Sequence, residues 1–210
     1  FEELYHCQSH LIFNGIAKSQ IDSTLNNVID GLRKTKKTKI FIHAGRISEP
    51  KNQLVLCKVF NRLIAKGNDV VLVIAGSPEE KAIYKSIEPY FSDRIVYLGE
   101  RNDIADLMSH ADAFCLPSLW EGLPVTLLEA LSVGCIPICS PVGGIVNVIE
   151  SGKNGLLSKD SSESEYFITV NSFLNMTDEE RVSMKEEALK SFAKYDIKNC
   201  ANQYLKVYSE

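Results

Sequence analysis

From Lys39 onward, strand-like and helix-like segments alternate along the chain, and this alternation constrains the fold more than any other feature. Short apolar or β-branched runs, typical of buried strands, occupy 39–45, 69–76, 94–99, 113–117, 136–140 and 154–158. Helical spacing or helix start signals occupy 50–67, 77–90, 102–110, 124–134 and 143–151, and mostly helical sequence follows. The order predicts an α/β fold, with a Rossmann-like parallel sheet, right-handed crossovers and helices on both faces.

Sheets of this kind bind ligands beyond the carboxyl ends of their strands, which here are the loops 45–51, 76–79, 98–103, 117–124 and 140–145. The formal net charge of −4 argues against a nucleic-acid partner, because phosphate backbones require a basic excess. The six cysteines form no C-x-x-C pair and lie mostly in apolar runs, which indicates reduced core residues of a cytoplasmic protein. No apolar run approaches the ~20 residues of a membrane span, and no signal peptide is evident.

Residues 1–38 do not share the alternation. The pair Asn14-Gly15 is a turn signal, and "GLRKTKKTK" (31–39) carries five positive charges. We interpret the basic stretch as a solvated linker or helix end, with contact to an anionic membrane surface as the alternative. His6 and His10 have the spacing of two zinc ligands on a helix, but no third ligand accompanies them, so no metal site is predicted.

The stretch "HAGRISEPKNQ" follows the first expected strand. Gly45 lets the backbone turn closely, Arg46 follows at once, and Pro50 starts the next helix with Lys51 in its first turn. A cation there opposes the helix dipole, and residues that break a local rule tend to mark functional sites. Arg46, Lys51 and the helix N-terminus together predict an anion site suited to a diphosphate. The alternative is a surface Lys51 and an Arg46 paired with Glu49.

Between Pro124 and Gly134 the expected helix carries only one charge, Glu129. A carboxylate in such apolar company needs strong donors, and the two hydroxyls of a ribose would supply them. Glu121, in the loop before the helix, could hold hydroxyls of a second sugar. The alternatives are that Glu129 pairs with a buried arginine or lysine and that Glu121 faces solvent. Free backbone N–H groups at the helix start would face phosphate or sugar oxygens, and they belong to Gly122, Leu123, Val125 and Thr126.

Several segments resemble a known family. "EGLPVTLLE" has the E-x7-E spacing of GT-B-fold glycosyltransferases of the GT4, or group 1, type, and "GRISEPKN" resembles their Gly-Arg…Lys loop. "YLGERNDIADLMSHADAFCLPS" resembles their base-side strand and helix, and "SPVGGIVNVIESGKNGLL" their closing Gly-Gly segment. The similarity covers about residues 40–157 in order. One position departs from it, because Asn147 stands where the family often has an acid.

The resemblance implies a nucleotide-sugar (donor) binding domain at 39–210, preceded at 1–38 by a linker and the end of an absent N-terminal acceptor domain. It implies that Arg46 and Lys51 bind the diphosphate, Glu121 the transferred sugar and Glu129 the ribose, with Gly45 at the phosphate loop. Leu98, Gly99 and Arg101 would border the base.

The implied reaction is retaining hexosyl transfer in polysaccharide biosynthesis, from a nucleoside-diphosphate sugar to an acceptor glycan or lipid-linked sugar. Neither metal nor further cofactor is expected, and the chain has no Asp-x-Asp. The fragment alone is expected to be inactive, and the enzyme to be cytoplasmic or peripheral at the inner membrane face.

Two other functions remain open. A nucleotide-sugar epimerase or a phosphorylase would keep the fold and change the chemistry, although no segment suggests a lysine for pyridoxal phosphate. A non-enzymatic α/β regulatory domain would need an aspartate at the end of the first or third expected strand, where Gly45 and Gly99 stand instead.

Overall fold

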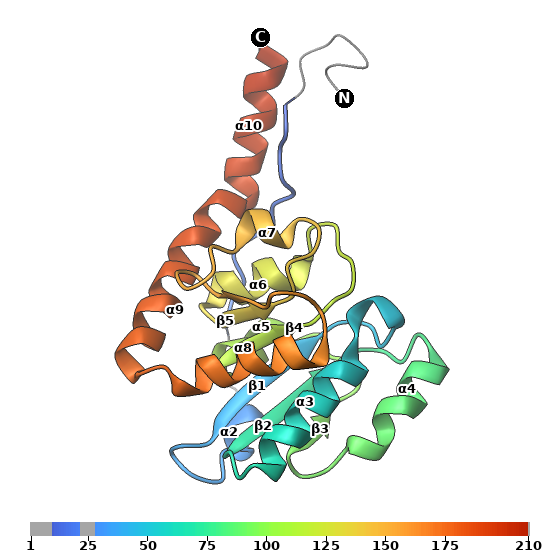
Figure 1. Ribbon diagram of the computed structural model, residues 1–210. Coiled ribbons are helices and arrows are strands. Elements are labelled where there is room, and N and C mark those ends of the chain that lie inside the picture. Colours follow the sequence, from blue (N-terminus) through green and yellow to red (C-terminus); the bar gives the residue numbers. More distant parts are fainter. Residues whose placement is uncertain (1–9, 22–27, 210) are drawn as a thin grey trace.

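The computed structural model describes residues 10–21 and 28–209, and their centre is a parallel six-stranded sheet in the order β3-β2-β1-β4-β5-β6 (Figure 1). The strands are β1 (Lys39–Ala44), β2 (Val70–Ala75), β3 (Ile95–Tyr97), β4 (Ala113–Leu116), β5 (Ile136–Cys139) and β6 (Leu156–Leu157). The helices are α2 (Val28–Gly31), α3 (Gln53–Ala65), α4 (Lys81–Ile87), α5 (Ile104–His110), α6 (Val125–Val133), α7 (Ile145–Val148), α8 (Glu163–Asn175), α9 (Asp178–Phe192) and α10 (Ile197–Ser209). The predicted α/β, Rossmann-like parallel sheet is thus confirmed.

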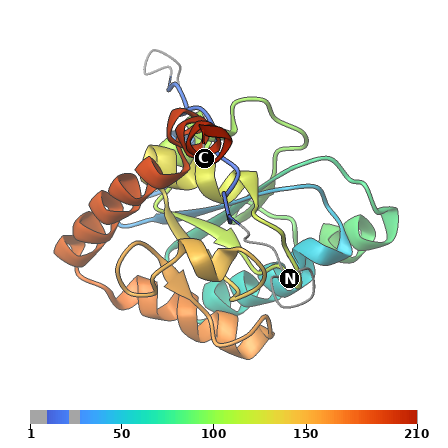
Figure 2. The same cartoon turned by 90° about the horizontal axis from the view of Figure 1, so that it is seen from above.

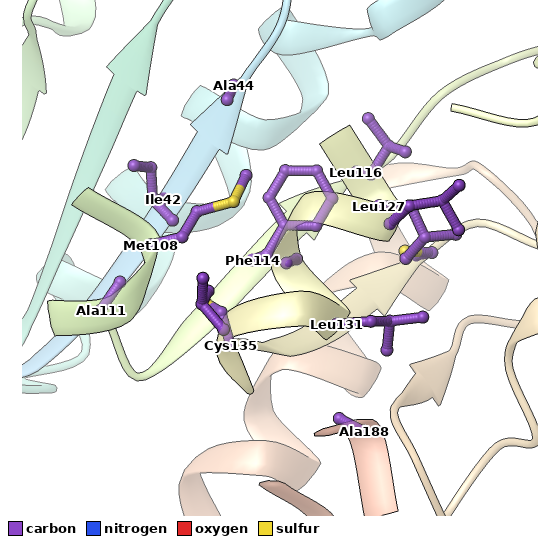
Figure 3. Close-up of a cluster of buried hydrophobic side chains, with 14 of the residues drawn as sticks. Ile42, Ala44, Met108, Ala111, Phe114, Leu116, Leu127, Leu131, Cys135 and Ala188 are labelled. Atoms are coloured by element: carbon purple, nitrogen blue, oxygen red, sulfur yellow. The ribbon is translucent and has the colours of Figure 1, made fainter. Parts of the chain in front are cut away.

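Side chains alternate along each strand, so the sheet has two buried faces and two cores. Ile40, Ile42 and Ala44 of β1 point into the core that contains residues of α2, α5, α6 and α9, part of which Figure 3 shows. Phe41 points to the opposite face, where its ring meets Phe60 of α3 and Phe173 of α8. Helices on both faces explain why the strands read as continuous apolar runs.

The chain reverses its direction of sheet growth between β1 and β4. It adds β2 and β3 on one side of β1 and then returns to place β4, β5 and β6 on the other. In open parallel sheets the crevice at this reversal, beyond the carboxyl ends of the two strands, is where ligands bind. The loops after β1 and β4 border that crevice.

Several predicted helix starts are wrong by a few residues. A 3-10 turn covers Glu49–Lys51, Asn52 adopts a left-handed conformation with φ 54°, and only then does α3 begin. Lys51 therefore precedes α3 instead of lying in its first turn. Similarly, α4 begins at Lys81, and Pro124 is the residue before α6 instead of its first helical residue.

The segment at 10–21 is extended and lies beside the 3-10 helix η3 (Ala193–Tyr195) and beside α10, which projects from the sheet domain (Figures 1 and 2). Ile16 bonds through its backbone N–H to Tyr195 and through its carbonyl to Ile197. The predicted turn at Asn14-Gly15 is absent. Gly15 meets a packing requirement instead, because a Cβ there would lie 2.5 Å from the sulfur of Cys200.

The basic stretch at 31–39 is largely paired with acids. Arg33 and Lys39 form ion pairs with Asp112, and Lys34 pairs with Asp93. The interpretation of this stretch as a purely solvated linker is therefore incomplete, because three of its five cations are paired and fewer remain for contact with an anionic surface. Among the described residues, five cysteines are buried and unpaired, as predicted, and no helix is long and apolar enough to cross a membrane. Cys7 and His6 lie outside the described residues.

Candidate functional site

The loops after β1 and β4 meet in an ion pair. Lys51 Nζ lies 2.5 Å from Glu121 Oε1, and both side chains are largely shielded from solvent, with 18% and 10% exposed. The hydroxyl of Ser118 donates to the same carboxylate oxygen at 2.7 Å. The structure thus brings two predicted site residues together, and Glu121 neither faces solvent nor lacks a partner.

Asn52 holds the loop that carries Lys51. Its side-chain amide donates to the carbonyls of Pro117 and Ser161, both at 3.1 Å. The backbone N–H of Leu119 donates to the Pro50 carbonyl at 2.8 Å, which joins the same two loops a second time. Asparagine adopts a left-handed backbone conformation more readily than most residues. Asn52 can therefore form this turn while its side chain links the loop to Pro117 and Ser161.

Arg46 lies apart from the Lys51–Glu121 pair. Its guanidinium is 68% exposed and pairs with Glu79 at 2.7 Å, not with Glu49. Its backbone N–H has no hydrogen-bond acceptor among the described residues. An exposed ion pair of this kind contributes little, roughly 0–1 kcal/mol, so the guanidinium can exchange Glu79 for another anion at small cost.

Glycines allow the carboxyl-end loops to approach one another. Gly76 has φ 153°, and a Cβ on it would lie 1.9 Å from the carbonyl oxygen of Gly45. Gly143 has φ 53°, and a Cβ there would lie 1.7 Å from the carbonyl oxygen of Glu121. Gly45 was expected to let the backbone turn closely, and the geometry shows that this turn does not exclude a side chain there. A Cβ at Gly45 would make an ordinary 3.6 Å contact with the stem of Lys51, so Gly76 is the residue the approach requires.

Glu129 lies half-buried on α6, and its carboxylate has no hydrogen-bond or ion-pair partner among the described residues. Burial raises the pKa of this carboxyl above its ordinary value. The alternative of a buried arginine or lysine partner is therefore excluded for the part of the chain that is described. An unpaired carboxylate in this setting is a group that needs hydrogen-bond donors.

The backbone N–H groups at the start of α6 also lack partners within the described residues. The N–H groups of Gly122, Leu123, Val125 and Thr126 donate no hydrogen bond to the described residues. The carbonyl of Gly122 is occupied, because it accepts the N–H of Gly144 at 2.6 Å. The start of α6 therefore offers donors beside Glu121.

The predicted base-side residues lie after β3. Leu98 packs on the core, and the Gly99 carbonyl accepts the N–H of Gly76 at 2.8 Å, which joins the loops after β2 and β3. Arg101 binds Asp103 through two nitrogens, and this contact raises the pKa of its guanidinium. The three residues border the same edge of the sheet as the Lys51–Glu121 pair, without a direct contact to it.

Sequence reasoning missed two polar residues behind the loop 45–51, His43 and Gln53. Both are fully buried, and Nε2 of His43 lies 3.1 Å from Nε2 of Gln53. Burial lowers the pKa of His43 to about 4, opposed by its hydrogen bond to the Cys115 carbonyl and assisted by the charge of Lys51. The signal in the sequence that could have pointed to this pair is a histidine near the end of an otherwise apolar strand.

Among the residues that the structure describes, no three His, Cys, Asp or Glu side chains gather into a group that could hold a metal ion. The polar groups near the reversal between β1 and β4 include the shielded cation of Lys51, the exposed cation of Arg46, the carboxylates of Glu121 and Glu129, and the N–H donors at the start of α6. Fold and site together define a Rossmann-like α/β domain whose functional groups gather at the topological reversal between β1 and β4.

The chain belongs to the glycosyl transferases group 1 family, whose model matches residues 26–191. It is 33% identical over 137 residues to the N,N'-diacetylbacillosaminyl-diphospho-undecaprenol alpha-1,3-N-acetylgalactosaminyltransferase of Campylobacter jejuni, covering 65% of this chain and 36% of that protein. It is 28% identical over 184 residues to the UDP-Gal:alpha-D-GlcNAc-diphosphoundecaprenol alpha-1,3-galactosyltransferase of Escherichia coli, covering 85% and 43% of the two chains. The chain thus spans less than half the length of these relatives.

Solved structures agree on the fold. The Anabaena protein Alr3699/HepE in complex with UDP-glucose superposes with a TM-score of 0.79 at 20% identity, over 94% of this chain and 56% of that one. The sheet and its helices therefore match GT-B neighbours, and the predicted family and fold are confirmed.

Proposed function

We propose that this chain is the donor-binding domain of a retaining glycosyltransferase, with residues 39–210 forming that domain and 1–38 the end of an acceptor domain and its linker. The observation that supports it most is the Lys51–Glu121 pair at the reversal between β1 and β4. The pair joins a cation suited to a diphosphate and a carboxylate suited to sugar hydroxyls. The donor is a nucleoside-diphosphate sugar that delivers a hexosyl group.

In this proposal Lys51 and Arg46 exchange their present partners for the donor diphosphate. Both contacts hold positive charge where negative charge develops as the glycosidic bond to the leaving diphosphate breaks. The unpaired N–H groups at the start of α6 face phosphate or sugar oxygens, and Gly45 leaves room for the diphosphate beside the stem of Lys51. No metal ion or further cofactor is required.

Glu129 binds the two ribose hydroxyls, and Glu121, once released by Lys51, binds hydroxyls of the transferred sugar. Each carboxylate gains neutral hydroxyl donors. At Glu129 these donors satisfy the lone pairs of the half-buried carboxylate, although they counteract its raised pKa less than a cation would. Leu98, Gly99 and Arg101 border the base. The sheet holds these groups fixed, so binding places the anomeric carbon for attack by the acceptor.

Calorimetry with UDP, GDP and ADP, in buffer containing EDTA, tests the donor site. At least one nucleotide binds the wild-type chain, and silence from all three at millimolar concentration overturns the proposal. Arg46→Ala plus Lys51→Ala weakens the diphosphate far more than the matching nucleoside. Lys58→Ala, an exposed lysine on α3, is the matched control and leaves both affinities unchanged.

The ribose assignment has its own test. The wild-type chain prefers the nucleotide that binds over its 2′-deoxy form, and Glu129→Gln loses most of that preference because a neutral amide accepts more weakly from two hydroxyls. Glu88→Gln, an exposed residue remote from α6, keeps the preference. Equal discrimination by wild type and Glu129→Gln would place the ribose elsewhere.

The acceptor is a glycan or lipid-linked sugar, reached through the N-terminal domain. The names of two relatives specify diphospho-undecaprenol acceptors, which supports a lipid-linked sugar. We place the reaction at the cytoplasmic face of a membrane as part of this proposal. Residues 1–210 bind donor but transfer no sugar to such an acceptor. Measured turnover by this fragment would contradict the requirement for a second domain.

A further inference from the structure

A buried line of hydrogen bonds runs behind the turn at 46–48. His43 Nδ1 lies 2.9 Å from the carbonyl oxygen of Cys115, and His43 Nε2 lies 3.1 Å from Nε2 of Gln53. Gln53 Nε2 donates onward to the Arg46 carbonyl at 2.8 Å, and Gln53 Oε1 accepts the N–H of Ser48 at 3.3 Å. One carboxamide thus binds both ends of the turn that carries Arg46.

The partners fix where the protons lie. A carbonyl only accepts, so the ring of His43 must donate to Cys115 from Nδ1. His43 Nε2 is then the acceptor, and Gln53 must direct its NH2 group, not its oxygen, toward the ring. With the amide reversed, oxygen would face the lone pair of His43 and the Arg46 carbonyl, while nitrogen would face the Ser48 N–H.

The fold explains why the line can form. Side-chain alternation places His43 on the same face of β1 as Phe41, which is the face that α3 covers. Gln53 is the first residue of α3 and is fully buried there. Cys115 belongs to β4, the strand across the topological reversal, so the line ties the turn to both strands that border the crevice.

We propose that Gln53 is a positioning residue for the diphosphate-binding turn, and that neutral His43, with its proton on Nδ1, fixes the orientation of the Gln53 carboxamide. The inference rests on the proposed donor site, because the turn matters only if the diphosphate binds there. Gln53 touches no ligand. Its hydrogen bonds to the Arg46 carbonyl and the Ser48 N–H hold the turn that carries Arg46, whose own N–H makes no hydrogen bond to the described residues.

Three variants separate this role from a merely structural one. Gln53→Met removes the carboxamide and strands the polar groups it serves. The double variant His43→Leu with Gln53→Met also removes the imidazole, so no unpaired ring nitrogen is left beside the new methionine, while the Arg46 carbonyl and the Ser48 N–H still lack the carboxamide. Thr38→Val is the control, because it removes a buried hydroxyl that donates to Asp69 at 2.8 Å at the opposite end of β1.

Calorimetry with UDP, GDP and ADP and urea unfolding are measured for each variant. Gln53→Met and the double variant bind the diphosphate about tenfold more weakly than wild type, while nucleoside affinity is unchanged in both. Thr38→Val loses stability and keeps diphosphate affinity. If either Gln53 variant binds the diphosphate with wild-type affinity, the positioning role alone is overturned. If the wild-type chain binds none of the three nucleotides, the donor site and the positioning role are overturned together.

A spectroscopic measurement needs no nucleotide. The imidazole 15N shifts of His43 in the wild-type chain report a protonated Nδ1 and an unprotonated Nε2 at pH 7. A proton on Nε2 would reverse the Gln53 carboxamide and overturn the inference, even if the chain binds nucleotides as proposed.

Discussion

Lys51 Nζ lies 2.5 Å from Glu121 Oε1, although seventy residues separate the two in the chain. The pair closes the gap between the loop after β1 and the loop after β4, where the sheet reverses its direction of growth. Each residue satisfies the other's charge in the absence of ligand. Any anion that binds Lys51 must therefore compete with Glu121, and this competition can be measured.

Replacing Glu121 by glutamine is expected to tighten nucleoside-diphosphate binding about fivefold, or about 1 kcal/mol, because Lys51 no longer has a competing carboxylate. Lys51→Met is expected to weaken the same binding. Calorimetry with the nucleotide that binds wild type measures both. Glu150→Gln, which breaks the exposed Lys153–Glu150 pair, is the control and leaves affinity unchanged. Weaker binding by Glu121→Gln would contradict competition between carboxylate and diphosphate.

Trp120 offers a direct reporter of this site, because it is the only tryptophan of the chain and is 55% exposed beside Glu121. Release of Glu121 from Lys51 is expected to change the surroundings of the indole and shift its fluorescence when a nucleoside diphosphate binds. Lys51→Met should show no such shift at the same concentrations. A wild-type emission spectrum that stays constant at saturation, as established by calorimetry, would show that the loop at 117–124 does not respond to the ligand.

The stability of the protein is expected to fall as the pH decreases from about 6.5 toward 4. Burial lowers the pKa of His43 from 6.5 to about 4, so the unfolded chain takes up this proton before the folded chain does. Between these values the difference amounts to roughly 3 kcal/mol of unfolding free energy, fully present above pH 6.5 and lost below 4. Urea unfolding across this range measures it. In His43→Leu, the loss of unfolding free energy between pH 6.5 and 4 should be smaller by about this amount. An unchanged pH dependence would mean that His43 titrates normally in the folded chain.

Gly143→Ala is expected to lower the unfolding free energy by about 2–4 kcal/mol and to weaken nucleotide binding. Its φ of 53° is strained for alanine, and the new Cβ would lie 1.7 Å from the Glu121 carbonyl oxygen. Gly152→Ala provides the control, since Gly152 has φ 85° but no atom within 4 Å of the new Cβ. That variant should lose only about 1 kcal/mol, from backbone strain. Equal losses would show that strain, not the contact with Glu121, governs both positions.

Local pattern was sufficient for the sheet and its helices, because burial on both faces of a parallel sheet leaves a continuous apolar run in each strand. The E-x7-E motif and the Gly-Arg…Lys stretch likewise located Glu121, Arg46 and Lys51 in the loops beside these elements and Glu129 in the middle of α6. Helix starts were less accurate. The left-handed turn at Asn52 delays α3, and its cause is a pair of hydrogen bonds to distant carbonyls.

The sequence by itself determined which segments become strands and helices and which charged residues stand at the sheet's edge, since both follow from spacing within a few residues. Only the tertiary structure decided which of those charges meet. It paired Lys51 with Glu121 and Arg46 with Glu79, left Glu129 unpaired, and gave Gly76 the close approach expected of Gly45. The physical reason is that the packing of loops from different strands determines which polar groups come within contact distance. The spacing of residues along the chain does not encode the distances between those loops.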